Sequence, residues 1–423
     1  MAREIAEHVA RRAITDASVA DVVLNFGGLD ITACETAGLA HDLGHPPFGH
    51  VGEHILDERL RTEAVGDWDG FEGNAQTMRI VTVLARRRRN ASLDLTNVTL
   101  AAIAKYPWVR DIEATTTPDG HFLPHGKPHV KFSAYSSERD ALQQARTAVM
   151  PNDDDVDYGA TKARPQQSLE ASIMDLADDI AYSIHDLEDF CVSGTIKIER
   201  VREELSRARL QLEGGEDLNG DSNVFVDAVA KLQRDYKQFD QNSFVAAISE
   251  VYGLFDRMSS NPGGTWTPGD FELIVRQQLS HKVDRFFGAI RCDNEVGMPP
   301  VYLGEAPWHE MQVMKLITKR FLVSSPAVGR LQRAQTAALN SLFDNLVAWV
   351  REATDLRTLP PSLQDALQVN AAVLPEGEPL TLGHYRGIRD YLCGLSDAQA
   401  FSISQWLSGI ALPGASLNDL PSA

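Results

Sequence analysis

Sixteen residues near the start of the chain, 39–54, hold an unusual concentration of ionisable side chains. These are His41, Asp42, His45, His50, Glu53 and His54. A lone histidine on an apolar face is usually a satisfied core residue, but burying this many ionisable groups without a metal or a ligand would cost several kcal/mol. The stretch therefore predicts a functional site rather than a packing motif.

The types and order of these side chains indicate the chemistry. His41 and Asp42 are adjacent at the end of a predicted helix, so they offer an imidazole nitrogen and a carboxylate oxygen from one place. That donor pair suits a borderline or hard divalent cation such as Mn, Fe, Co or Mg. His45, His50 and Glu53 follow closely and are placed to move protons.

A second stretch, residues 167–190, contains no glycine or proline and is predicted to form one long helix. Asp178, Tyr182 and Asp186 recur every four residues and therefore share one face of that helix. Residues 171–189 hold six acidic side chains but no lysine or arginine that could form ion pairs with them. Such acidic crowding favours a bound cation.

Both stretches resemble the HD-domain metal-dependent phosphohydrolases, and specifically the deoxynucleoside triphosphate triphosphohydrolases of the dGTPase type. The similarity lies in His41-Asp42, in the Gly-His-Pro-Pro-Phe-Gly-His string and Glu53 that follow, and in the Ala-Asp-Asp-Ile-Ala-Tyr string before Asp186. The resemblance implies an all-α fold, with an HD-domain helical core and an appended C-terminal helical region.

The resemblance also implies roles for the residues of the reacting centre. His41, Asp42 and Asp178 would hold the metal ion. His50 would transfer a proton to or from the reacting oxygens, helped by Glu53 one helical turn away. In addition, His45 would contact the α-phosphate, Tyr182 would lie against the deoxyribose, and Asp186 would accept a hydrogen bond from the sugar 3′-hydroxyl.

Further residues match segments of the family that hold phosphates. Lys105-Tyr106 follows a predicted short helix over 97–104 and resembles a grip on the terminal phosphates; an exposed lysine beside an interfacial tyrosine is the alternative. Lys131 matches a phosphate-contacting lysine. The string 70–79 opens a helix at which Asn74 and Gln76 could hold phosphate oxygens, although helix capping explains Asn74 almost as well.

One family element lies outside this sequence. Relatives take a further metal-binding histidine from a Thr-His-Ser-Leu-Glu-Val-like string on the preceding helix, and the match with that helix begins here at about Met1. Either the start codon is placed too late or one ligand is lost; His8 lies too far along the helix to replace it. We expect low activity and sub-stoichiometric metal from the chain as given.

The composition limits the partners. The net charge is −19, from 40 basic and 59 acidic side chains, which opposes non-specific binding to nucleic acid or to an anionic membrane surface. The cysteines, Cys34, Cys191, Cys292 and Cys393, show no Cys-x-x-Cys spacing, so neither a zinc ribbon nor a disulfide framework is indicated. With no signal peptide and no membrane span in the sequence, we predict a cytoplasmic protein.

Three other charged segments are assigned no catalytic role. The run Arg86–Arg89 usually marks a solvated face, with contact to an effector nucleotide or a neighbouring subunit as the alternative. The loop with His121, His125 and His129 contains prolines that forbid a helical metal site. The acidic loop 151–165 lacks the glycine and closing glutamate of a calcium loop.

Periodicity predicts helices along most of the remaining chain. The predicted helices cover 2–13, 17–25, 31–42, 49–61, 197–212, 223–238, 241–256, 268–290, 306–353, 361–371, 382–394 and 397–410, with a loop at 293–304. The resemblance implies a phosphohydrolase core over 1–195 and, over 196–423, a helical region that helps to cover the substrate and to build a homo-oligomer. Ser396-Asp397-Ala398 stands where the family usually continues Thr-Asp-Arg, so that arginine's role is not carried over.

The leading hypothesis is therefore metal-dependent hydrolysis of a deoxynucleoside 5′-triphosphate to the deoxynucleoside and inorganic triphosphate. Another HD-domain nucleotidase or phosphodiesterase, and a weak or inactive subunit that only binds dNTP, are the alternatives. The expected partners are the dNTP substrate, an effector nucleotide and further copies of the chain, with no membrane and no strong nucleic-acid binding.

Overall fold

The computed structural model describes residues 1–64, 66, 69–85, 92–110, 130–150, 167–214, 223–259, 267–294, 298–373 and 378–409. The arginine run 86–89, the histidine-containing loop 121–129 and the acidic loop 151–165 lie outside these ranges. All twelve residues predicted to form the site lie inside them.

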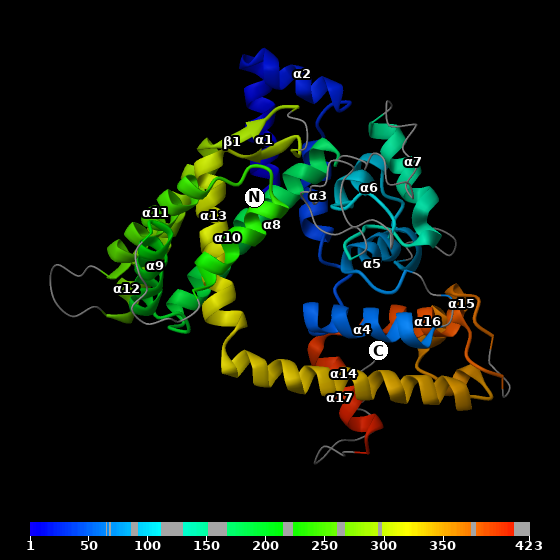
Figure 1. Cartoon of the computed structure of the whole chain (residues 1–423). Helices are drawn as coiled ribbons and strands as arrows, with labels where there is room; N and C mark the ends of the chain where they lie inside the picture. Colours follow the sequence, from blue (N-terminus) through cyan, green and yellow to red (C-terminus); the bar gives the residue numbers. More distant parts are fainter. Residues whose placement is uncertain are drawn as a thin grey trace.

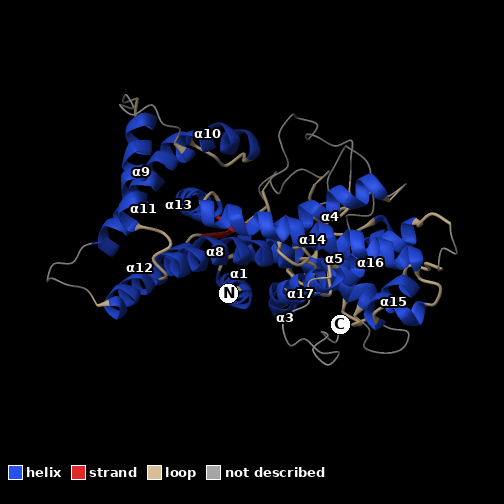
Figure 2. Ribbon diagram, turned by 90° about the horizontal axis from the view of Figure 1, so that it is seen from below, coloured by secondary structure: helices blue, strands red, loops and turns tan. Residues whose placement is uncertain are grey.

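The described part of the chain is mainly helical, with one short pair of strands, which confirms the all-α prediction (Figures 1 and 2). Its α-helices are α1 (Ala2–Thr15), α2 (Ala17–Asn25), α3 (Ile31–Ala40), α4 (His50–Glu63), α5 (Gly73–Arg79), α6 (Asn97–Ile103), α7 (Arg139–Val149), α8 (Leu169–Val192), α9 (Ile198–Leu212), α10 (Val224–Asp235), α11 (Gln241–Ser259), α12 (Pro268–Gly288), α13 (Glu305–Thr318), α14 (Pro326–Glu352), α15 (Pro361–Val369), α16 (Leu382–Leu392) and α17 (Asp397–Leu407). Among the described residues, no helix combines the length and apolarity needed to cross a bilayer.

The predicted helix over 306–353 is wrong as a single element. The chain instead forms α13, a π-helical turn at Lys319–Val323 and then α14. The Ser325 hydroxyl accepts the backbone N–H of Val328, and Pro326 occupies the first turn of α14, where its missing N–H costs nothing. A serine cap followed by proline therefore starts a new helix where periodicity alone continued the old one.

Two other elements differ from the sequence predictions. Strands β1 (Ile290–Cys292) and β2 (Val301–Leu303) form a short antiparallel pair, with Arg291 opposite Tyr302, where the sequence predicted a helix end and a loop. Three-residue strands are too short to show a period of two. The amphipathic helix α7 was not predicted; it buries Leu142 and Ala145.

The hydrophobic side chains gather in two main clusters. The first cluster contains side chains of α1, α2 and the helices from α8 to α13. The second contains side chains of α4, α14, α15, α16 and α17. Figure 1 shows α8 and α13 side by side through the middle of the molecule and α14 extending from the end of α13 beneath α4. The boundary at residue 195 stays a prediction, but these clusters group α4 with the C-terminal helices.

A buried ion network ties α5 to α16. The Arg79 guanidinium donates to both carboxylate oxygens of Asp390, at 3.1 and 2.9 Å, and to Glu138 at 2.8 Å. Burial alone would raise the pKa of Asp390, but the guanidiniums of Arg389 and Arg79 outweigh it and hold that pKa below its ordinary value. A lowered folded-state pKa stabilises the fold above the unfolded value of about 3.9, and that contribution is lost as the pH falls further.

We expect Asp390→Asn to lower the free energy of unfolding by about 3 kcal/mol or more at pH 7, because it removes the buried carboxylate that Arg79 and Arg389 share. The difference from wild type should shrink as the pH falls below about 4, because the carboxylate of the unfolded chain takes up a proton there while the folded chain still holds Asp390 ionised. Urea denaturation at pH 7 and at about pH 3 measures both effects. Asp355→Asn, at an exposed pair with Arg357, is the control and should leave the transition midpoint unchanged.

Candidate active site

The His-Asp doublet lies at the C-terminal end of α3. Asp30 caps the start of this helix by accepting the N–H of Ala33, and the helix ends at His41. The imidazole Nε2 of His41 lies 3.1 Å from Asp42 Oδ2 and 3.4 Å from Asp178 Oδ1. Helix α8 packs against α3 and brings Asp178 to the doublet, so the structure gathers all three predicted metal ligands around one nitrogen.

The chemistry of these three side chains suits a divalent cation, but their ligand atoms would have to move closer together to hold one, since they do not all lie within 4.8 Å of one another. His41 Nδ1 lies 2.9 Å from the Gly38 carbonyl oxygen, and donation to that oxygen leaves Nε2 as the ligand atom facing both carboxylates. Hydrogen bonds to Asp178 and Asp42 raise the pKa of His41 to about 10. His41 would have to lose its Nε2 proton to hold a cation, with Nε2 and the carboxylate oxygens of Asp42 and Asp178 as the ligand atoms.

Asp178 also belongs to an acidic group on α8. Oxygens of Asp175, Asp178 and Asp179 all lie within 4.8 Å of one another. Lys105 Nζ lies 2.8 Å from both Asp175 Oδ1 and Asp178 Oδ2, and Lys315 Nζ lies 2.6 Å from Asp179 Oδ1. The acidic crowding predicted from the sequence is present, but lysines from other elements neutralise part of it.

The three residues that are predicted to move protons lie in one connected chain beside the doublet. Glu53 Oε2 lies 2.8 Å from His50 Nδ1, and Glu53 Oε1 lies 3.1 Å from His45 Nδ1. His45 Nε2 in turn lies 3.0 Å from Asp42 Oδ1. Asp42 and Glu53 raise the pKa of His45 to about 10. Burial would raise the pKa of Glu53, but His45 and His50 outweigh it and lower that pKa below its ordinary value.

The backbone before α4 is held in an unusual conformation. Phe48 and Gly49 have φ of 69° and 54°, in the left-handed region that a phenylalanine rarely adopts. The Phe48 N–H donates to Asp397 Oδ1 at 2.9 Å, and its ring packs 4.7 Å from that of Phe401. Residues of α17 therefore hold the turn that presents His50, whose side chain is 83% exposed while that of Glu53 is 11% exposed.

The start of α5 differs from its prediction. Glu72, not Asn74, is the N-cap, and its carboxylate accepts the N–H groups of Asn74 and Ala75. Asn74 donates its side-chain amide to Glu72 Oε1, and the Gln76 amide donates to buried Asp390. These donors are already bonded within the protein, so phosphate binding at this helix start would require them to exchange partners, and it stays a prediction.

The two lysines that are predicted to contact phosphate pair with different acids. Lys131 Nζ lies 2.9 Å from Glu72 Oε1 and 3.7 Å from Glu53 Oε2, whereas Lys105 contacts the acids of α8. Burial would lower the pKa of Lys131, but Glu72 and Glu53 outweigh it and raise that pKa above its ordinary value. Both ammonium groups are therefore charged beside the candidate ligands.

The remaining predicted substrate residues occupy the edges. Tyr106 follows Lys105, and burial raises the pKa of its hydroxyl. Tyr182 and Asp186 continue the face of α8 beyond Asp178; Tyr182 is 41% exposed, and burial raises the pKa of Asp186. Their contacts with a deoxyribose stay predictions.

Sequence reasoning missed two buried acids of this site. Asp175 precedes Asp178 by three residues, a spacing that places both on adjacent turns of one helix face, and it could have been found from that spacing. Glu72 caps α5 and binds Lys131 from 59 residues away in the sequence. No local pattern predicts that pairing.

An all-helical core that presents a His-Asp doublet with a distant aspartate defines a class, the HD-domain phosphohydrolases. The model of the HD domain family matches residues 1–183, which include the doublet, the proton-moving residues and Asp178.

Similar proteins, two of which match more of the chain than the domain model does, specify the family. A deoxyguanosinetriphosphate triphosphohydrolase-like protein of Corynebacterium efficiens is 37% identical over 337 residues, covering 78% of this chain and 70% of that protein. The protein of the same name from Corynebacterium diphtheriae is 30% identical over 350 residues, with 80% and 72% covered. One from Bifidobacterium longum is 40% identical over 172 residues, with 40% and 31% covered. The chain belongs to this dGTP triphosphohydrolase-like family of HD-domain proteins.

Proposed function

We propose that the protein hydrolyses deoxynucleoside 5′-triphosphates to the deoxynucleoside and inorganic triphosphate in the presence of a divalent cation. The observation that carries this proposal is the position of His41 Nε2 between Asp42 and Asp178, with the His50–Glu53 pair beside it. The names of the relatives support the substrate class.

Different side chains would hold the metal ion and transfer the proton. His41, Asp42 and Asp178 would hold a divalent cation, whose contribution is Lewis-acid activation of the phosphate. Water attacks the α-phosphorus and the bond to the 5′-oxygen breaks. His50 transfers a proton to or from the reacting oxygens, and Glu53 fixes its tautomer through Nδ1.

Other residues position the substrate. His45 contacts the α-phosphate, while Lys105, Tyr106, Lys131 and Asn74 contact the outer phosphates. Tyr182 and Asp186 hold the deoxyribose. For these contacts to form, Lys105 must exchange its hydrogen bond to Asp178 for one to a phosphate oxygen. Asn74 must likewise give up its hydrogen bond to Glu72.

The identity of the inorganic product tests the proposal. We expect incubation of each dNTP with the protein and Mn²⁺ to release triphosphate and deoxynucleoside in equal amounts, measured by anion-exchange and reversed-phase chromatography. Pyrophosphate or orthophosphate would instead indicate another HD-domain nucleotidase. Tight dNTP binding without any product, measured by calorimetry, would indicate a binding subunit.

The same preparation tests the remaining expectations. Metal analysis by inductively coupled plasma mass spectrometry measures the ion content per chain, and light scattering measures the homo-oligomer that we propose. Activity with and without a second dNTP tests for an effector nucleotide. A cytoplasmic location stays a prediction.

A further inference from the structure

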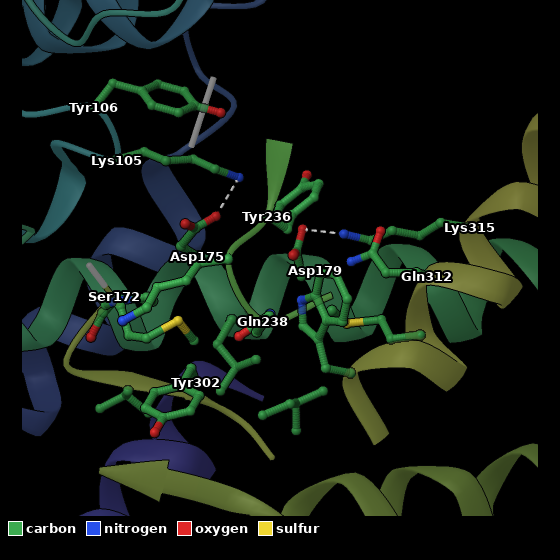
Figure 3. Close-up of a pocket in the computed structure, with 18 of the residues that line it drawn as sticks. Lys105, Tyr106, Ser172, Asp175, Asp179, Tyr236, Gln238, Tyr302, Gln312 and Lys315 are labelled. Carbon is green, nitrogen blue, oxygen red and sulfur yellow. Dashed lines mark ion pairs between the residues drawn. The ribbon is translucent and has the colours of Figure 1, made fainter. Parts of the chain in front are cut away.

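A pocket of about 280 Å³ lies between α8, α13 and β2, beside the candidate active site (Figure 3). Lys105, Tyr106 and Lys131 form part of its wall, so the pocket opens where the substrate phosphates are proposed to lie. Its volume is near the lower end of the range of about 300–1,000 Å³ that is typical of small-molecule sites. The space therefore suits a small ligand or one part of a nucleotide.

Aromatic and apolar side chains form much of the remaining wall. Tyr236, Tyr302 and Trp308 come from three separate segments, and the rings of Tyr236 and Trp308 lie 5.2 Å apart at an angle of 61°. Leu176 and Met311 contribute apolar surface from α8 and α13. Such walls favour a flat ring that packs against π-systems and apolar side chains.

The charges at the pocket favour a neutral ligand. Lys105 is paired with Asp175 at 2.8 Å, and Lys315 with Asp179 at 2.6 Å; these ion pairs lie on either side of Tyr236 in Figure 3. A polyphosphate in the body of the pocket would have to compete with these carboxylates for both ammonium groups. A neutral heterocycle with polar edges would leave both ion pairs intact.

Two side-chain amides supply polar groups at the same wall. Gln312 is buried, at 7% exposure, and Gln238 lies across the pocket from it in Figure 3. The oxygen Oε1 of Gln238 is buried and has no hydrogen-bond partner in the part of the chain that the structure describes. A buried unpaired acceptor costs free energy, which a ligand N–H would recover.

We propose that this pocket binds the base of a nucleotide, with Gln238 Oε1 accepting a hydrogen bond from a ring N–H or an exocyclic amino group. The inference rests on the proposed function, which makes deoxynucleotides the ligands of the chain. The base has two sources. It belongs either to the substrate, whose phosphates then extend past Lys105 toward His41 and Asp42, or to a second nucleotide bound beside the substrate.

Binding of the four deoxynucleosides to the full chain in EDTA tests the pocket without phosphates, metal or turnover. We expect Gln238→Leu to weaken the preferred deoxynucleoside at least about tenfold by calorimetry, since the hydrogen-bond acceptor is lost. Trp308→Phe should remove most of the tryptophan quenching caused by the ligand while the calorimetric affinity stays within about threefold. Gln277→Leu, at an exposed amide on α12, is the matched control and should bind like wild type.

The two sources predict different stoichiometries. If the base is the substrate's own, the deoxynucleoside competes with a non-hydrolysable dNTP analogue for one site per chain. If it belongs to a second nucleotide, both ligands bind together. Either result supports a base pocket, and a chain that binds deoxynucleosides through Gln238 without hydrolysing dNTPs would contradict only the proposed function.

Unchanged deoxynucleoside binding in both Gln238→Leu and Trp308→Phe, with wild-type quenching in the latter, would overturn the inference. A second result would also overturn it: tripolyphosphate, in EDTA, displaces the deoxynucleoside, and Lys315→Met weakens the tripolyphosphate binding. The pocket would then hold phosphates rather than a base. Thermal unfolding of each variant separates a local effect from a loss of fold.

Discussion

Asp178→Ala should abolish dNTP hydrolysis and remove more than about 99% of the affinity for a divalent cation. Asp178 is the one proposed ligand that comes from outside the doublet, and its carboxylate faces His41 Nε2 at 3.4 Å. Loss of a residue that merely orients a ligand already costs about 10–100-fold in metal affinity, so the loss of a direct ligand should cost more. Titration with Mn²⁺, followed by electron paramagnetic resonance of the free ion, measures the affinity, and product release measures the turnover.

The control for this variant is on the same helix. Asp189→Asn removes an exposed carboxylate from α8 and should retain both the metal affinity and the turnover. Asp178 also pairs with Lys105, but Asp175 remains as a partner for that lysine, so we expect the variant to fold. Wild-type metal affinity in a folded Asp178→Ala protein would remove Asp178 from the ligand set.

His50→Ala should lower kcat by about 10²–10⁴-fold while the metal content stays unchanged, because general acid-base catalysis typically contributes that factor. The His50 ring is exposed toward solvent, and its Nδ1 lies 2.8 Å from the largely buried Glu53 carboxylate. Glu53 thereby holds one tautomer and leaves Nε2 available to a substrate. Steady-state kinetics and metal analysis of the same preparation test both parts of the prediction.

His54→Ala provides the matched comparison, since His54 is exposed on the next turn of α4. That variant should keep wild-type kcat. Full turnover by His50→Ala would eliminate the proton-transfer assignment, whereas parallel losses of metal and of turnover would indicate a structural role for His50.

The local parts of the site were predictable from the sequence. Short spacing fixes the relation of His41 to Asp42 and of His50 to Glu53, because each pair lies within one helical turn or one short loop. The acid-rich face of α8 was also visible, since its carboxylates recur without basic partners. The family resemblance related Asp178 to the doublet, and the helix packing shows how they meet.

Contacts between distant segments were not predictable in the same way. Lys131 pairs with Glu72, and Lys315 with Asp179, across 59 and 136 residues respectively. No periodic pattern encodes such partners, because tertiary packing decides them. The start of α14 is a different case, since Ser325-Pro326 is a recognisable helix-start signal that lies within a stretch of continuous helical periodicity.

The candidate site straddles the two hydrophobic clusters. The carboxylate of Asp178 is anchored by α8, whereas His50 and Glu53 move with α4, whose apolar face packs against α14 and its successors. Any rocking of one helical body against the other would change the gap between the cation-holding groups and the imidazole that shuttles protons. If the protein catalyses the proposed hydrolysis, the alignment of His50 with the predicted metal ligands depends on how the two hydrophobic clusters pack against each other.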